Sequence, residues 1–336
     1  MISNAILKEE PYVYKGAKNI TTHKTFVDIC KLPQKYLKKA LNNILGYYYE
    51  NVINEDGFIY AKGTDPVLLT AHMDTVHEER VKDFYELREQ GKTIISSSQG
   101  IGGDDRCGIY MICHILENTD YRPSILFCED EEIGGVGSKK FCKTAYIEDL
   151  KELKFFIELD RANANDAVYY DCGNRDFKDF VREITGYKEA YGSFSDISNL
   201  SPATDVASVN LSCGYYNAHT LKEEVVYEEM MDTVEVTEKL IKASRECEAF
   251  DYQEELPWRF NGTSWYTKAN YDENFMGLSI EYFVINPENN KEVRDYDYIE
   301  GSTYEECLGI FMMSHPYTCY DDIMDIEEIY ADDYFY

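Results

Sequence analysis

The chain has 336 residues, a formal net charge of −30 and ten cysteines. Nucleic acids and anionic membranes are poor partners for such a chain, because proteins bind their negative charge with clustered lysine and arginine. The sequence has no apolar stretch of the roughly 20 residues that a membrane span needs, no leader-like start and no Cys-x-x-Cys pair, so we expect a cytoplasmic protein with reduced thiols.

Alternating helical and strand patterns run from the start of the chain to residue 244. Apolar residues at helical spacing predict a helix over 25–45, packed on a sheet edge. Four apolar runs predict buried strands at 67–69, 124–128, 155–159 and 206–211. Helical patterns lie at 106–117, at 137–145 and, after a capping Thr220, at 222–244. This order predicts an α/β fold, a three-layer α/β/α sandwich with a mostly parallel central sheet.

The chain changes character near residue 246 and becomes strongly acidic and rich in aromatic residues. A strand-like run at 278–285 and a helical run at 304–314 predict a small α+β appendage. We therefore expect a main domain over 1–245 and an appendage over 246–336. The roles open to the appendage are a substrate gate, an oligomer contact and a docking surface for a partner.

Two histidines and several acids follow the apolar runs or stand at glycine-rich turns. In open α/β sheets this edge, outside the carboxyl ends of the strands, is where ligands bind. Mixed nitrogen and oxygen ligands suit zinc, cobalt or manganese better than calcium, which would need all-oxygen ligands. In chain order the polar segments are 72–74 (His-Met-Asp), 104–106 (Asp-Asp-Arg), 129–132 (Glu-Asp-Glu-Glu), 158–160 (Glu-Leu-Asp) and His219.

In this order the residues resemble the ligand signature of the co-catalytic metallopeptidase superfamily, which includes peptidase families M20, M28 and M42. The resemblance covers roughly residues 60–245 and implies a zinc-exopeptidase fold for the domain 1–245. It also implies two divalent metal ions, zinc before cobalt or manganese, and hydrolysis of an amide bond by a metal-bridging water. By resemblance, one ion is held by His72 and Asp160, the other by Glu132 and His219, and Asp104 bridges them.

The resemblance also assigns the supporting residues. Asp105 is the alternative to Asp104, which is preferred because the family motif reads Asp-x-Lys/Arg-x-Gly with the ligand first. Asp74 would accept the second ring N–H of His72 and so fix its orientation. Glu131 would be the general base that moves a proton from the attacking water to the leaving amine.

Two further features of the sequence accompany these residues. Residues 192–196 (Gly-Ser-Phe-Ser-Asp) are similar to a Gly-Gly-Thr-Asp stretch of the same peptidases, with Ser195 in place of the threonine, which suggests a substrate contact by Ser195 or Asp196. The alternative is a turn with a capping serine. His77 is interpreted as a surface residue.

The number of residues between the proposed ligands indicates which subfamily the chain resembles. Asp160 and His219 are 59 residues apart (219 − 160), too few for the lid domain of M20 enzymes. The 32 residues between His72 and Asp104 (104 − 72) are too few for the M42 insertion. The arrangement is therefore most similar to a lid-less, M28-like exopeptidase, although residues 72–76 resemble M20 sequences more.

The leading hypothesis for function is an aminopeptidase acting on short peptides, with Glu131 and Asp160 holding the substrate amine. A carboxypeptidase or N-acyl-amino-acid amidohydrolase is the alternative, and it would need a cation such as Arg161 or Arg175 for the substrate carboxylate. Two other classes remain: a non-catalytic binding protein on a peptidase scaffold, and a single-metal transferase related to glutaminyl cyclases.

Overall fold

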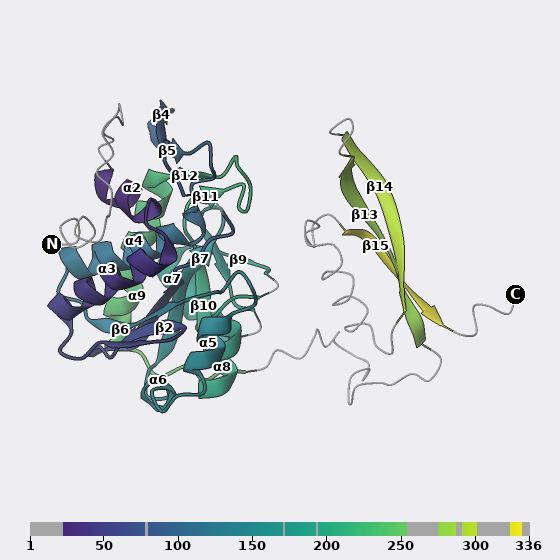
Figure 1. The fold of residues 1–336 in the computed structure, drawn as a ribbon. Coiled ribbons are helices and arrows are strands. Elements are labelled where there is room, and N and C mark those ends of the chain that lie inside the picture. Colours follow the sequence, from purple (N-terminus) through teal and green to yellow (C-terminus); the bar gives the residue numbers. More distant parts are fainter. Residues whose placement is uncertain are drawn as a thin grey trace, which may run out of the picture. The chain divides into compact units, whose positions relative to one another are not determined.

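A computed structural model describes residues 23–77, 80–170, 172–192 and 194–253, together with the backbone of three strands between 275 and 330. The chain divides into two compact units, Met1–Glu255 and Leu256–Tyr336 (Figure 1).

The first unit is built on an eight-stranded sheet with the order β1-β2-β6-β3-β7-β10-β8-β9. Its central strands β6, β3, β7 and β10 run parallel to one another. These strands are buried almost throughout because both of their faces are covered. The strands are β1 Ile53–Glu55, β2 Phe58–Ala61, β3 Asp65–His72, β6 Pro123–Cys128, β7 Phe155–Arg161, β8 Asp166–Val168, β9 Lys188–Ala190 and β10 Ser208–Ser212.

Helices cover both faces of this sheet (Figure 1). Successive residues of β3 point to opposite faces, so that Val67 and Leu69 join one apolar core and Leu68 joins the other. The larger core includes residues of α2 Lys24–Cys30, α3 Gln34–Tyr48, α4 Gly103–Asn118, α7 Arg175–Thr185 and α9 Tyr227–Ser244. The smaller core includes residues of α5 Val136–Phe141, α6 Ile147–Leu150 and α8 Ile197–Thr204. The predicted three-layer α/β/α sandwich is confirmed.

The first unit also contains a four-stranded sheet of order β11-β12-β5-β4, which the sequence patterns did not predict. All of the pairs within it are antiparallel. Its strands are β4 Tyr85–Glu89, β5 Lys92–Ser96, β11 Tyr215–Tyr216 and β12 Glu224–Val226.

Three predicted helices are wrong in extent, and the one expected over 137–145 is the shorter α5, which ends at Phe141. The single helix expected over 25–45 is two helices, α2 and α3, because Pro33 has no amide hydrogen for a continuous helix and instead precedes α3 in an extended conformation. The helix expected from residue 222 begins at Tyr227, since Glu224–Val226 pairs with β5 as β12. Thr220 caps no helix there; its hydroxyl donates to the carbonyl of Asn217 within a turn.

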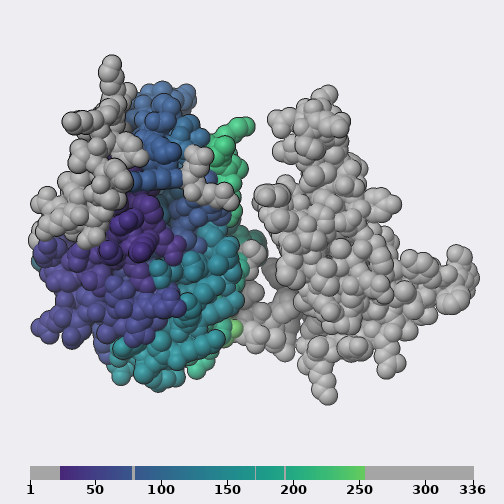
Figure 2. Space-filling view, in the orientation of Figure 1, coloured from purple at the N-terminus to yellow at the C-terminus, as the bar shows by residue number. Residues whose placement is uncertain are grey.

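Segments from the beginning of the described chain and from the region after β6 meet at the surface of the first unit. In the space-filling view, the purple N-terminal residues adjoin the teal residues that follow β6 (Figure 2). Lys140 of α5 forms an ion pair of 2.7 Å with Asp56, in the turn between β1 and β2.

The second unit contains a three-stranded antiparallel sheet of order β14-β13-β15. Its strands are β13 Phe275–Asn286, β14 Lys291–Glu300 and β15 Ile323–Tyr330. The strand predicted at 278–285 lies within β13, and the helix predicted at 304–314 falls outside the described residues.

Candidate metal centre

The residues singled out by the sequence meet beyond the carboxyl ends of the parallel strands. His72 is the last residue of β3, and Asp160 is near the end of β7. Glu131 and Glu132 follow β6, Asp104 lies at the start of α4, and His219 lies in the loop between β11 and β12. The polar side chains share this edge because β3, β6 and β7 are parallel neighbours.

Three of these side chains form a compact group around the ring of His72. Its Nε2 atom lies 3.0 Å from Asp104 Oδ1 and 3.3 Å from Asp160 Oδ1. The possible ligand atoms of these three residues all lie within 4.8 Å of one another. The imidazole is almost fully buried, so its nitrogen faces these carboxylates rather than bulk water.

A second group forms around His219. Its Nε2 atom lies 3.1 Å from Asp104 Oδ2 and 3.1 Å from Glu132 Oε2. The ligand atoms of this group also lie within 4.8 Å of one another. His219 has a φ of 62°, a conformation uncommon for a residue with a side chain and often found at functional sites. Asp104 belongs to both groups, one oxygen facing each histidine.

The chemistry of both groups fits divalent metal ions. Within the described residues no group donates a hydrogen bond to two buried oxygens, Glu132 Oε1 and Asp160 Oδ1, although buried carboxylate oxygens normally have partners. Carboxylates also outnumber cationic groups around the cluster, and packed negative charge is costly unless it is paired or binds metal. Imidazole nitrogens combined with carboxylate oxygens form a set that zinc and similar ions prefer.

The pKa values reflect the mutual proximity of the same groups. Burial and the charge of Asp104 raise the pKa of Asp160 to about 7. Burial opposes the charged form of Asp104, yet hydrogen bonds to His219 and His72 hold its pKa below the usual range. Hydrogen bonds to Asp104 and Glu132 raise the pKa of His219 to about 11.

Asp74 orients both the histidine and the acidic loop. Its Oδ1 atom lies 3.2 Å from His72 Nδ1 and accepts a hydrogen bond from Glu131 N, and its Oδ2 atom accepts one from Glu132 N. The side chain of Glu131 is in neither ligand group. Burial, followed by the charge of Asp160, raises the pKa of Glu131 to about 9.

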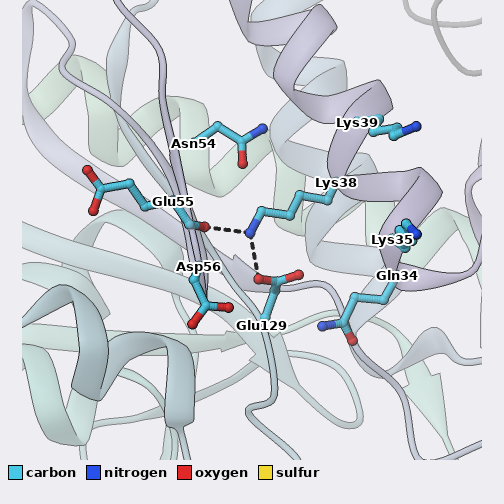
Figure 3. A pocket seen from close by; sticks show the side chains of 8 residues that line it. All are labelled: Gln34, Lys35, Lys38, Lys39, Asn54, Glu55, Asp56 and Glu129. Carbon is cyan, nitrogen blue, oxygen red and sulfur yellow. Dashed lines mark hydrogen bonds and ion pairs between the residues drawn. The ribbon is translucent and has the colours of Figure 1, made fainter.

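Glu129 and Asp130, the first two acids of the segment 129–132, contact other parts of the chain and belong to neither ligand group. Glu129 Oε2 accepts hydrogen bonds from Lys38 Nζ at 2.5 Å and from Gly57 N at 2.9 Å, beside a surface cavity of about 530 Å3 (Figure 3). Gln34 Nε2 donates to Asp130 Oδ1. These contacts hold the beginning of the loop against α3 and the turn after β1.

The Asp-Asp-Arg-Cys-Gly segment, residues 104–108, forms the start of α4. Asp105, the alternative ligand, accepts hydrogen bonds from His72 N and Gly108 N, and it is in neither ligand group. A Cβ atom on Gly108 would lie 1.9 Å from the carbonyl oxygen of Leu159, so only glycine lets α4 approach β7 so closely. Asp104 therefore faces the cluster while Asp105 binds the backbone behind it.

Glu223 is a buried residue of the site that the sequence did not reveal. Its Oε1 atom accepts a hydrogen bond from Asp104 N at 3.0 Å, and its Oε2 atom accepts one from Gly102 N at 2.8 Å. Oε2 also lies 2.8 Å from His77 Nε2. The prediction that His77 is a surface residue is wrong, because its side chain is 8% exposed and contacts Glu223. In sequence Glu223 resembles any acid near a helix start, so no signal marked it.

Ser195 supports a proposed ligand. Its hydroxyl donates to Asp160 Oδ2 at 3.1 Å, and Asn210 Nδ2 donates to the same hydroxyl at 3.3 Å. Asn210 Oδ1 in turn accepts a hydrogen bond from Asp160 N. Asp196 is fully buried, whereas the neighbouring Phe194 is 37% exposed.

Residues 59–209 match the family model of peptidase family M28. The resemblance to the co-catalytic metallopeptidase superfamily is thereby confirmed, and the protein is a metal-dependent peptidase. Among the described residues, no helix combines the length and the hydropathy required to span a bilayer.

Several solved structures are also similar at low sequence identity. They include the aminopeptidase PepT of Bacillus cereus, with 14% identity, 66% of this chain and 97% of that chain covered, and a TM-score of 0.48. A tripeptidase of Staphylococcus aureus has 12% identity, the same two coverages and a TM-score of 0.49. The TET1 peptidase of Pyrococcus horikoshii has 14% identity, coverages of 63% and 97%, and a TM-score of 0.47. No curated protein sequence matches the chain.

Proposed function

We propose that the protein is a di-zinc exopeptidase that removes amino-terminal residues from short peptides. The main support is the sharing of Asp104 between two groups of metal-ligand side chains. In this proposal His72 and Asp160 hold one ion, Glu132 and His219 hold the other, and Asp104 bridges them. All of these residues lie in the first unit, so we assign catalysis to the domain 1–245 and treat residues 246–336 as an appendage to it.

The proposed mechanism assigns a proton transfer to Glu131. When bound, two divalent ions lower the pKa of water and polarise the scissile carbonyl. Glu131 takes a proton from the attacking water and returns it to the leaving amine, a role that requires a carboxylate beside the reacting atoms but not among the ligands. Its backbone amide is held by Asp74, which therefore positions the base and His72 together.

Substrate selection follows from the charge of the site. The free amine of a peptide is cationic, so the carboxylates of Glu131 and Asp160 are suited to bind it. A direct test measures hydrolysis of amino-acid p-nitroanilides and of N-acetyl amino acids by the same preparation. The proposal expects activity on the p-nitroanilides, and hydrolysis of the acetylated set alone would refute an aminopeptidase.

One observation favours a carboxypeptidase or N-acyl-amino-acid amidohydrolase as a second candidate. Arg161, the residue after Asp160, is half-buried, and its buried Nε atom has no hydrogen-bond partner in the described part of the chain. A guanidinium of this kind can bind the carboxylate of a substrate through hydrogen bonds. Arg175, the other cation considered, is exposed at the start of α7. If the protein is a carboxypeptidase or amidohydrolase, Arg161→Gln should raise KM for N-acetyl amino acids. If it is an aminopeptidase, Arg161→Gln should leave KM for amino-acid p-nitroanilides unchanged.

A further inference from the structure

A second cavity, of about 230 Å3, lies on the Asp74 side of His72. Its wall comes from the junction between α2 and α3, from the segment after β3 and from the turn before α4. Three cationic side chains, Lys31, Arg80 and Arg106, line it, and Asp74 supplies the carboxylate among its described lining residues. Cationic side chains thus outnumber carboxylates among the described lining residues, within a chain whose net charge is −30.

Arg106 is the central feature of this cavity. The residue is 4% exposed, and its Nε and Nη1 atoms are buried without a hydrogen-bond partner in the described part of the chain. A buried guanidinium without a partner is strongly unfavourable, since it has lost its water and gained no acceptor. Its position in the first turn of α4 fixes this side chain against the cavity.

The neighbouring carboxylates bind other groups, and within the described residues they form no hydrogen bond with Arg106 Nε or Nη1. Asp74 accepts from the backbone of Glu131 and Glu132 and contacts His72. Both oxygens of Asp105 accept backbone hydrogen bonds, from His72 and Gly108. The described residues thus supply no acceptor to these two guanidinium nitrogens.

We propose that this cavity binds a small oxyanion on Arg106. The guanidinium is a permanent cation whose N–H groups form charge-assisted hydrogen bonds with the oxygens of a phosphate, sulfate or carboxylate. Arg80 contributes a second guanidinium to the wall, and its Nε atom is fixed by a hydrogen bond of 2.8 Å to the carbonyl of Lys31. The proposal does not rest on the proposed peptidase function, since it concerns binding behind Asp74 and not hydrolysis.

Binding can be measured on the full chain, purified with its metal ions, by thermal unfolding in sulfate against chloride at equal ionic strength. At ten times Kd, sulfate should raise the Tm by about 3–5 °C. Arg106→Gln should abolish this rise, and Arg80→Gln should weaken sulfate binding several-fold. Arg88→Gln, at an exposed arginine of β4, is the matched control and should respond as the wild type does.

The position of the anion is tested separately, because an oxyanion could bind the metal ions instead. Selenate is a sulfate analogue whose anomalous scattering locates it in a crystal. The proposal expects a selenate peak within hydrogen-bonding distance of the Arg106 guanidinium. Acetate and a free dipeptide, added in competition, distinguish an inorganic oxyanion from a substrate carboxylate as the source.

Three results would overturn the proposal. They are an absent sulfate response in the wild type, an equal response in Arg106→Gln, and selenate found only beside His72 and His219. Should Arg106→Gln fail to fold, Arg80→Gln and the selenate map still decide the question.

Discussion

Replacement of Glu223 by glutamine tests whether a residue behind the metal ligands sets metal affinity. The carboxylate serves three donors: Gly102 N, Asp104 N and His77 Nε2. A glutamine has one acceptor oxygen, so its NH2 group must face a donor that the carboxylate had accepted. If the amide oxygen keeps the contacts of Oε2, the unsatisfied donor is the backbone amide of Asp104.

The size of the effect follows from that single lost bond. A hydrogen bond to a charged group contributes about 1.5–3 kcal/mol, and the loss falls on the residue proposed to bridge both ions. We expect metal affinity to fall about 10- to 100-fold, the range found when groups supporting metal ligands are removed. The assay is competition for zinc with a chelator of known affinity, combined with denaturant unfolding of the metal-free protein.

Glu224→Gln is the matched control, because the half-buried Glu224 lies next in sequence and makes no side-chain hydrogen bond to the described part of the chain. It should bind zinc as the wild type does. The reasoning is refuted if Glu223→Gln retains wild-type zinc affinity while folding normally.

Three further substitutions separate the proposed roles. Glu131→Gln should lower kcat by about 10²–10⁴-fold while metal content stays unchanged, and loss of metal would instead make it a ligand. Ser195→Ala removes the hydroxyl that donates to Asp160 and should weaken zinc binding several-fold, measured by the same competition, whereas an effect on KM alone would indicate a substrate contact. Phe194→Ala removes an exposed ring beside the site and should raise KM for peptides with apolar side chains; an unchanged KM would place the ring outside the substrate path.

The central strands and the cluster were predictable because local sequence determines both. The run Val67–Leu69 is apolar on both faces, and a strand buried in this way places its functional polar residues where it ends, at His72. Parallel neighbours then bring Asp160 to the same edge. Physical reasoning gives this convergence, while the division of the residues between two ions came from family resemblance.

The parts of the fold and of the site that the sequence did not predict depend on contacts between distant parts of the chain. β12 exists because Glu224–Val226 pairs with β5, more than a hundred residues earlier, and no local pattern distinguishes it from a helix start. The same holds for His77 and Glu223, which are 146 residues apart in sequence and 2.8 Å apart in space. The break at Pro33 is different, because a proline within an amphipathic pattern is itself a visible signal.

The most direct test of the shared aspartate is metal content by mass spectrometry, for the wild type and for Asp104→Ala. We expect about two zinc ions per wild-type chain and loss of both in the variant, since each ion would lose a ligand. A metal-free wild type, or an Asp104→Ala variant that still binds two ions, would contradict the account.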